Sequence, residues 1–540
     1  MIRLISCTVL ALVCAACSTD AVTLPIDFNE QKVKVVEVDY GVELGPAVAL
    51  PGVQGGPIAT VLGDAQLLEQ FLKAGIDTVR LPQGYLCDYT LSGVFPSPAG
   101  NPDDPAAYSF GSIDAAMAGA SALGGVVLWQ AIWDVGLTNC DEAAQPDGSG
   151  KPPADKALWA KVVVNTLRHF NSDLLSGTPG AVWDDPSGRE FGVRHVEFLD
   201  DPMGRGGYTD VTAVVDDFVL FAESVKTAFP NVFDGTPRIS VVGPAMSVGS
   251  AGEVAGGPIL QFLDELITRG KIDLLDVLSF QTAVTHPAEN GAIAVALRAA
   301  LDERALSDRV ELWATRYTPD PTLPETEEPT NELQVGPWSI YAGAFATATK
   351  IHWQETVDRA IFYRGDRRHR SIDGSNISIV EQSPLWDKAG QWRPAGIAWQ
   401  PWRLMTGGIG DDGQPTKRRL QVRSGNDVDA DGLAVLAVRE DNPCPDALFE
   451  QCPKVFVLVA NTNVQLGQSQ VDYQLNIAGL TNTGEGTRQV RINWSIIDET
   501  TREFTFAEST LITLIDDELF YQFESSVPAV DFLEIELNPR

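Results

Sequence analysis

The sequence is short of histidine, cysteine and positive charge. Its 540 residues include five His, seven Cys and 39 Lys and Arg against 73 Asp and Glu, which gives a net charge of -34 and a pI near 4.4. A surface this negative repels phosphate backbones, so the composition argues against a nucleic-acid partner. The histidines are scattered and no cysteine pair beyond the N-terminal segment has metal-ligand spacing, so no zinc site is expected.

Long apolar runs are also missing, except at the N-terminus. There a short basic start precedes the apolar stretch Leu4–Val13, which is too short to span a bilayer and is typical of an export signal. The following Cys-Ala-Ala-Cys resembles a bacterial lipobox, although its first cysteine stands where Leu is common. We predict a signal peptide over residues 1–17, Cys17 as the lipidated first residue of the mature chain, and a linker over residues 18–32. This indicates a bacterial cell-envelope protein, and the Ser after Cys17 favours an outer-membrane lipoprotein; ordinary signal cleavage is the alternative.

Four cysteines remain once the N-terminal ones are set aside, namely Cys87, Cys140, Cys444 and Cys452. An exported chain meets an oxidising compartment, where four cysteines form two disulfides in any of three connectivities. Position along the chain favours local pairing, so we predict the bonds Cys87–Cys140 and Cys444–Cys452.

Residues 33–410 alternate short β-branched runs with longer helical patterns. Eight alternations of this length predict a (β/α)8 barrel, whose buried parallel strands are near-continuous apolar runs. Irregular insertions at residues 318–337 and 366–376 follow the seventh and eighth strands, hence lie on the catalytic face. The expected strands are VKVVEV from Val33, TVRLP from Thr78, GVVLWQAI from Gly125, RHVEFLD from Arg194, RISVVGP from Arg238, LDVLSFQT from Leu275, VELWAT from Val310 and RAIFYRG from Arg359.

Residues 411–540 show a different pattern. Short segments of alternating hydrophobicity are separated by turn residues, with no long helix between them, and this predicts an antiparallel β-sandwich. We interpret it as an accessory domain that packs on the barrel and carries no chemistry of its own.

The order of these landmarks resembles glycoside hydrolase family 39, a family of clan A retaining glycosidases with (β/α)8 barrels. In that family one carboxyl group at the end of the fourth strand protonates the leaving oxygen, and another at the end of the seventh attacks the sugar carbon. The resemblance also places Arg80 where the family has an arginine near the nucleophile. It covers about residues 75–410 and the sandwich, and rests on VRLP from Val79, LWAKVVVNTLRHF from Leu158, VEFLDDP from Val196, VVGPA from Val241, LDVLSFQTA from Leu275 and VELWATRY from Val310.

At the fourth strand, the resemblance implies that Asp201 holds the acid/base position. VEFLDDP stands where the family has Glu-x-x-Asn-Glu-Pro, so aligning Glu197 and Pro202 replaces the catalytic Glu with Asp201. Asp200 then replaces the Asn that holds the sugar 2-hydroxyl. Aspartate can donate a proton, but its side chain is one methylene shorter, and a displacement of about 1 Å costs ~100-fold in rate.

At the seventh strand, no register of the resemblance supplies a carboxylate. The family has Thr-Glu-Trp or Glu-Trp-Asn-Tyr there, so the nucleophile falls on Ala314, Thr315 or Arg316, and Arg316 is favoured because TRY parallels Thr-Glu-Trp. Glu311 lies in the same strand, but upstream towards the barrel floor. At the sixth strand, Gln281 stands where the family often has His and is a candidate substrate ligand. The usual glutamates are therefore not retained.

Hydrolysis by another route stays open. Asp88 and Asp134 also follow barrel strands. Together with Asp201 they would supply the two carboxyl groups of an inverting mechanism, which stand about 6.5–9.5 Å apart and act on a water. The alternative function is thus an active glycoside hydrolase that uses Asp201 as general acid with a relocated carboxylate.

Arginines on the catalytic face are candidates for binding an anionic sugar. Arg205, Arg316 and Arg368 lie there in addition to Arg80, and guanidinium groups bind carboxylate and sulfate in bidentate fashion. Salt bridges within the acidic surface are the alternative interpretation. Trp133 is a candidate for stacking on a sugar face.

Calcium is the one cofactor that the sequence raises. The segment NDVDADG contains Asp427, Asp429 and Asp431, which resemble the opening of a calcium loop, but its twelfth position is Val438 rather than Glu. An acidic turn entering a strand explains the segment as well, and we expect no cofactor.

These features predict an exported glycoside hydrolase-like lipoprotein that binds a polysaccharide or oligosaccharide, uronate- or sulfate-bearing if the arginines contact it, with lost or altered catalysis. Whether it is an enzyme stays open; if active, it hydrolyses O-glycosyl bonds. A structural cell-surface lipoprotein is the third interpretation.

Overall fold

The computed structural model describes residues 33–57, 64–81, 90–132, 155–176, 191–204, 207–230, 239–320, 339–363, 365, 368–372, 377–381, 385–386, 391–406, 416–424, 432–440, 453–463, 470–480 and 489–537. Several predictions concern residues outside these ranges: the signal peptide, the linker, Cys17, both disulfides, and the calcium candidates Asp427, Asp429 and Asp431. They stay predictions.

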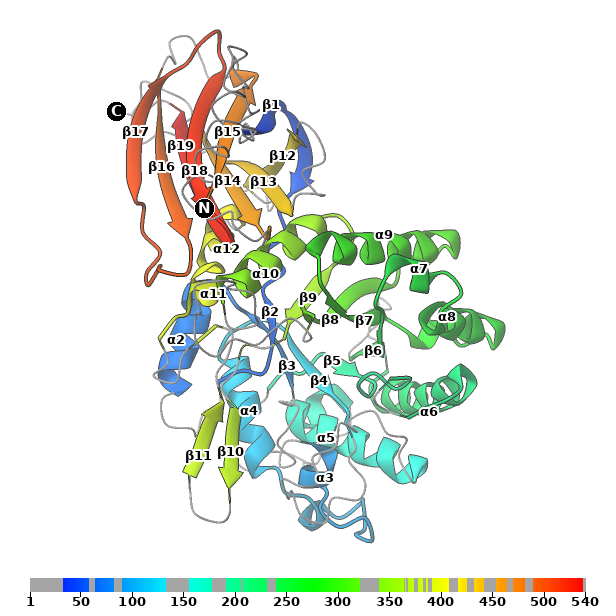
Figure 1. Ribbon diagram of the computed structural model, residues 1–540. Coiled ribbons are helices and arrows are strands. Elements are labelled where there is room, and N and C mark those ends of the chain that lie inside the picture. The colour runs from blue at the N-terminus through cyan, green and yellow to red at the C-terminus, as the bar shows by residue number, and fades with distance from the viewer. Residues whose placement is uncertain are drawn as a thin grey trace, which may run out of the picture.

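Eight parallel strands close into a barrel at the centre of the larger domain, as Figure 1 shows. This confirms the (β/α)8 prediction, and seven of the strands overlap the runs that the sequence picked out. The strands, in barrel order, are β2 Gly52–Gln54, β3 Thr78–Leu81, β4 Val127–Gln130, β5 His195–Glu197, β6 Ser240–Ser247, β7 Val277–Val284, β8 Glu311–Pro319 and β9 Arg359–Phe362.

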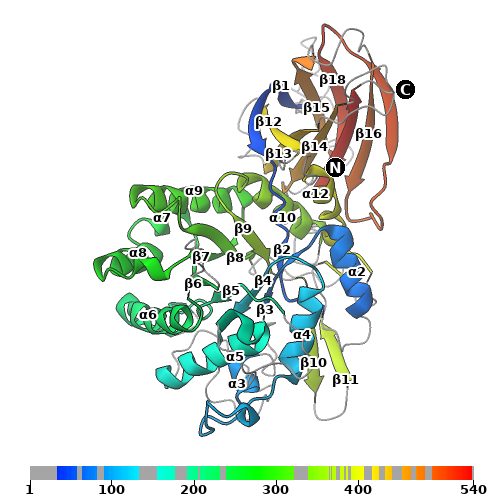
Figure 2. The same cartoon turned by 180° about the vertical axis from the view of Figure 1, so that it is seen from behind.

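Helices surround the barrel, and Figure 2 shows the ring from behind. Their apolar faces pack on the outward-facing strand residues in one continuous core. Within the described part of the chain, no helix combines the length and apolar character that crossing a membrane requires. The helices are α2 Asp64–Ala74, α3 Leu91–Val94, α4 Gly111–Ser121, α5 Lys156–Ser176, α6 Val211–Ala228, α7 Ala251–Val254, α8 Pro258–Thr268, α9 Pro287–Glu303, α10 Ile340–His352, α11 Pro394–Ile397 and α12 Gln400–Met405.

The prediction for the first barrel strand was wrong. The run from Val33 lies in β1 (Lys34–Pro46), which pairs in the other sheet, while the barrel begins at β2. The reason is visible in the burial of β1, where the buried Val36 and Val38 flank the exposed Glu37, the alternation of a half-buried strand. The true first strand is only Gly-Val-Gln, and at Gly52 a Cβ would lie 2.3 Å from the Ala360 oxygen.

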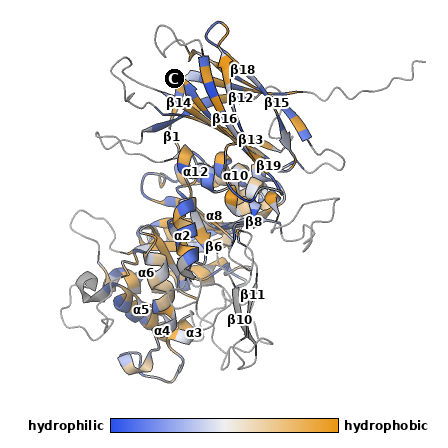
Figure 3. Ribbon diagram, turned by 90° about the vertical axis from the view of Figure 1, so that its left-hand side faces the viewer, coloured by the Kyte–Doolittle hydropathy of each residue, from blue (hydrophilic) through white to orange (hydrophobic). Residues whose placement is uncertain are grey.

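The second domain is a nine-stranded sheet folded around its own apolar core, which confirms the predicted sandwich. Its order is β17-β16-β19-β14-β13-β12-β1-β15-β18; the β1–β15 pair is parallel and the other pairings among these strands are antiparallel. Hydrophobic and hydrophilic residues alternate along these strands in Figure 3. The strands that join β1 are β12 Lys417–Ser424, β13 Leu433–Glu440, β14 Lys454–Asn461, β15 Gln470–Ala478, β16 Gln489–Ile497, β17 Glu508–Thr513, β18 Leu519–Ser526 and β19 Ala529–Leu537.

The sandwich rests on the barrel through α10 and α12. Ile340, Trp402 and Met405 form one buried cluster with Phe456 and Phe532 from the outer face of β14 and β19. The sheet of the second domain therefore packs against helices on the outside of the barrel.

The insertion after the last barrel strand is partly regular. Arg368–Ile372 (β10) and Ile377–Glu381 (β11) form an antiparallel hairpin, which extends beside α4 in Figures 1 and 2. Arg368 begins β10 and lies opposite Glu381 in the hairpin register.

Candidate functional site

Arg80 is the centre of a buried polar cluster at the carboxyl ends of the barrel strands. Its side chain is 0% exposed, and its Nε donates to Oε2 of Glu197 at 2.7 Å. Its Nη2 donates to Oδ1 of Asp200 at 2.9 Å and lies 2.5 Å from Oε2 of Glu197, while Nη1 donates to Gln54 at 3.3 Å. One guanidinium therefore joins residues from the first, second and fourth barrel strands.

Strand register explains why these residues meet. Gln54 on β2 lies opposite Arg80 on β3, and Gln130 on β4 lies opposite Glu197, the last residue of β5. The floor below them is apolar, with Leu128 and Trp313 in a small buried cluster inside the barrel. The polar layer lies above this plug, where parallel-barrel enzymes carry their chemistry.

Glu197 is fully buried, and burial raises the pKa of its carboxyl above the ordinary value of 4.5. The positive charge of Arg80 opposes this shift without overcoming it. Thr315 of β8 is close enough for its hydroxyl to favour the charged form of Glu197. No hydrogen bond of normal geometry joins the two, however, and among the described residues neither Oε1 of Glu197 nor Oγ1 of Thr315 has a hydrogen-bond partner.

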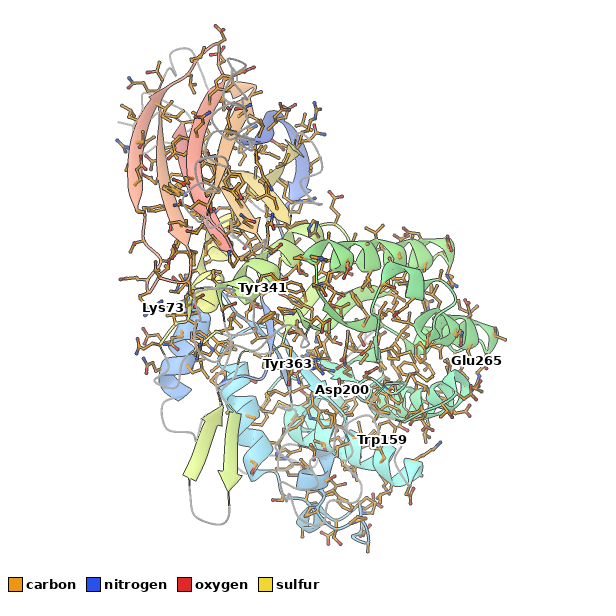
Figure 4. All side chains as sticks on the ribbon, viewed as in Figure 1. Lys73, Trp159, Asp200, Glu265, Tyr341 and Tyr363 are labelled. Carbon is orange, nitrogen blue, oxygen red and sulfur yellow. The ribbon has the colours of Figure 1, made fainter. Side chains whose placement is uncertain are left out.

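Asp200 lies toward the middle of the barrel, where Figure 4 labels it. Besides the contact with Arg80, its Oδ1 accepts a hydrogen bond of 2.5 Å from Nε2 of Gln281 on β7. The structure therefore brings together Arg80, Asp200 and Gln281, three of the residues that the sequence proposed for the site.

The side chain of Asp201 accepts a hydrogen bond from the protein backbone. Its Oδ1 accepts from the backbone N–H of Ser247, at the end of β6, at 3.0 Å. Its Oδ2 lies so close to Gly204 that a Cβ there would be 2.3 Å away. The residue has a φ of 47°, in the left-handed region, and only 6% of it is exposed. The geometry gives this carboxylate the role of a loop anchor.

A second buried contact holds the same loop. The hydroxyl of Tyr208 donates to Asp217 of α6 at 2.6 Å, and Lys156 of α5 lies 2.5 Å from the other oxygen of that carboxylate. The Tyr208 N–H also donates to the oxygen of Pro202 at 3.1 Å. The loop that carries Asp200 is thus fastened to two helices.

None of the predicted nucleophile positions on β8 carries a carboxylate: Thr315 lies near Glu197, whereas Ala314 is part of the core between the barrel and its helices. The register of β7 and β8 shifts between Phe280 and Gln281, so that Gln281 pairs with Arg316 and Thr315 is the extra residue. Arg316 is half-buried, and its guanidinium carbon lies 4.0 Å from the ring centroid of Tyr363, which follows β9. Glu311 begins the strand at the opposite end of the barrel and accepts from Trp313, so it belongs to the floor.

Sequence reasoning treated Glu197 only as an alignment landmark and did not name Gln54. The available signal for Glu197 was a charged residue inside an apolar strand. Trp133 and Arg205 lie outside the described residues, as do Asp88 and Asp134, and Arg368 is described only as part of the β10 backbone. Among the residues that the structure does describe, no group of three His, Cys, Asp or Glu side chains is arranged to hold a metal ion.

The barrel, the accessory sheet and the position of this cluster define a glycoside hydrolase-like fold. A glucosidase from Croceicoccus marinus has a TM-score of 0.63 at 20% sequence identity, covering 94% of this chain and 100% of its own. A monomeric beta-xylosidase from Caulobacter crescentus CB15 has a TM-score of 0.59 at 13% identity, with coverages of 94% and 100%. The GH39 enzyme from Xanthomonas axonopodis pv. citri has a TM-score of 0.58 at 12% identity, with coverages of 93% and 97%.

No family model matches the sequence, and a search of curated proteins gave no match. The solved structures confirm the resemblance to glycoside hydrolase family 39 at the level of the fold.

Proposed function

We propose that this chain is a glycoside hydrolase-like protein that binds a polysaccharide or oligosaccharide at the carboxyl ends of its barrel strands, without hydrolysing it by the retaining mechanism of the fold. The observation that carries the proposal is the set of partners around Arg80. The resemblance implies an arginine beside a nucleophilic glutamate on the seventh strand. Here Arg80 pairs with Glu197 and Asp200, both from the fourth-strand segment.

Asp200 replaces a neutral asparagine of the family pattern, so the negative charge beside the arginine has moved from the seventh strand to the fourth. A retaining mechanism needs a carboxylate on each side of the sugar, about 5–5.5 Å apart. Thr315 and Arg316 offer none on the seventh strand. An arginine there also opposes the positive charge that develops on the sugar in the transition state.

The geometry of Asp201 argues against the alternative of an active enzyme with that residue as its acid. A general acid must reach the glycosidic oxygen within hydrogen-bond distance. The oxygens of Asp201 instead lie against Ser247 and Gly204. The carboxyl group would have to leave both contacts before it could protonate a substrate.

Arg316 supports an anionic glycan as the ligand. It lies three residues before the end of β8, and its guanidinium group lies over the Tyr363 ring. This contact orients the guanidinium plane. Uronate and sulfate groups match the bidentate donors of a guanidinium.

The test combines glycan-array binding with a search for a covalent intermediate. We expect binding of uronate- or sulfate-bearing glycans, a loss of at least about tenfold in affinity in Arg316→Glu, and no labelling of β8 by an activated fluorosugar. Arg309→Glu, two residues before the start of β8 and with a side chain that is 41% exposed, is the matched control and should leave binding unchanged. A fluorosugar adduct on β8, or turnover abolished by Asp201→Asn, would establish the enzyme instead.

Export and lipidation are part of the proposal because the cell envelope would place the barrel near extracellular polysaccharides. Labelling with a fatty-acid analogue should modify the wild-type chain and fail in Cys17→Ala. Labelling that persists in this variant would remove the lipid anchor from the proposal.

A further inference from the structure

The two carboxyl groups beside Arg80 share one guanidinium in a fully buried place. Glu197 and Arg80 have no exposed side-chain surface, and Asp200 has 6%. The nitrogen Nη2 contacts both carboxylates, while Nε contacts Glu197 alone. Charges buried this way are costly unless they are neutralised and their oxygens are hydrogen-bonded.

The groups that face Glu197 from the neighbouring elements supply no second cation. Arg80 comes from β3, Asp200 from the segment after β5, and Thr315 from β8. Gln130, beside it on β4, directs its Nε2 to the Leu199 oxygen at 2.6 Å. Within the described part of the chain, Arg80 is therefore the one cation in contact with Glu197, and it also contacts the carboxylate of Asp200.

The two oxygens of Glu197 are in different situations. Oε2 lies within hydrogen-bond distance of two nitrogens of Arg80, while neither Oε1 nor the Thr315 hydroxyl near it has a hydrogen-bond partner in the part of the chain that the structure describes. An ionised carboxylate would leave a buried, negatively charged Oε1 without a donor of good geometry. A protonated Oε1 carries no charge, and leaving a neutral group without a hydrogen-bond partner costs far less than leaving a charged one.

We propose that Glu197 carries a proton in the folded protein at pH values where an exposed glutamate is ionised, with the proton on Oε1. Arg80 is then paired with Asp200 as its anion. Burial, which raises the pKa of Glu197, acts in the same direction. Glu197 is a positioning residue in this arrangement: it orients Arg80, which orients Asp200.

The proton also bears on the glycan, and this step rests on the proposed function. With Glu197 neutral, the cluster does not present two adjacent anions beneath an anionic sugar. We expect affinity for such a glycan to fall as pH rises and Glu197 ionises, and Glu197→Gln to remove that fall.

The sign of the pH effect on stability follows from linkage. A carboxyl group whose folded pKa is raised above its unfolded value contributes stability below the unfolded pKa, and loses it as pH rises through the folded pKa. The wild type should therefore lose stability relative to Glu197→Gln as pH rises from 4.5, the ordinary value for Glu197. An ionised, salt-bridged Glu197 would give the opposite slope.

The experiment measures melting midpoints of the full chain from acid to neutral pH for the wild type, Glu197→Gln and Asp200→Asn. Glu197→Gln should melt at or above the wild type at neutral pH, because glutamine has the same shape and, like the protonated glutamate, carries no charge. Asp200→Asn should lower the midpoint by several degrees, because it removes the anion of Arg80. Glu223→Gln, a surface residue with a 2.6 Å ion pair to Lys271, is the control for the loss of an ordinary glutamate charge.

Infrared spectroscopy gives an independent reading. The wild type should show a protonated carboxyl C=O band near neutral pH that Glu197→Gln lacks. Failure of Glu197→Gln to fold, or a midpoint well below the wild type with a gap that widens as pH rises, would overturn the proposal. These measurements use no glycan, so the proton assignment can fail while glycan binding stands, and the reverse.

Discussion

Replacing Arg80 with methionine should make the barrel strongly unstable at neutral pH and much less so in acid. Methionine keeps an unbranched chain of similar reach but removes every donor to Glu197, Asp200 and Gln54. Removing one partner of a buried ion pair costs about 3–5 kcal/mol, because the remaining charge has no compensation. The exposed fractions of 0% and 6% for the two carboxyl side chains place Arg80→Met in that range, not among surface pairs.

The pH dependence distinguishes this cause from a simple packing defect. Without Arg80, the ionised form of the buried carboxyl groups beside it loses its compensating charge, whereas the neutral form that prevails in acid needs none. The deficit relative to the wild type is then small below about pH 4 and grows as pH rises. A cavity or a lost apolar contact would give a deficit that does not change with pH.

The assay is urea unfolding of Arg80→Met and wild type at acid and neutral pH, followed by fluorescence and far-ultraviolet circular dichroism. Arg309→Met is the control, since it removes a 2.6 Å pair to Asp273 whose side chain is 82% exposed; such pairs contribute about 0–1 kcal/mol. A deficit for Arg80→Met below about 1 kcal/mol, or one that increases in acid, would refute the role assigned to Arg80.

Three further predictions concern buried groups elsewhere. Burial raises the pKa of Asp531 from 3.8 to about 7. At about 1.4 kcal/mol per unit, Asp531→Asn should therefore stabilise the sandwich by up to roughly 4 kcal/mol at pH 8 and not below pH 4, measured by urea unfolding. Burial lowers the pKa of Lys350, whose amine has no hydrogen-bond partner among the described residues and lies 3.3 Å from a tryptophan ring centroid. Lys350→Met should therefore raise the melting midpoint at neutral pH, with a gain that shrinks as pH approaches 10.5. A lower midpoint would show instead that the cation–π contact is net favourable. Gly204→Ala should displace the Asp201 side chain and destabilise the folded protein by about 1–3 kcal/mol. The control is Gly111→Ala, where a Cβ meets nothing within 4 Å, and it should leave stability unchanged. Equal melting midpoints for the two variants would contradict the contact between Gly204 and Asp201.

Local patterns in the sequence were enough for most of the architecture. Fully buried parallel strands such as Val127–Gln130 need apolar side chains on both faces, and the strands of the sandwich need them on one, so the two kinds of sheet differ in their residue order before they pair. The same reasoning explains why the prediction for β1 was wrong: its residues alternate as in a strand of the sandwich, although β1 precedes the barrel in the sequence. The absence of a carboxylate at Ala314, Thr315 and Arg316 also follows from the sequence and holds in any register.

Only the tertiary structure decided what the polar residues do. Arg80 and Glu197 are separated by 117 positions, and Asp200 and Gln281 by 81, so their contacts depend on the closure and register of the barrel. The direction of Asp201 depends on a left-handed backbone and on the N–H of Ser247, which arrives from the next strand. Residue type tells which charges a chain must bury, whereas the pairing of each charge depends on long-range strand order, because electrostatic and hydrogen-bond contacts reach only a few ångströms.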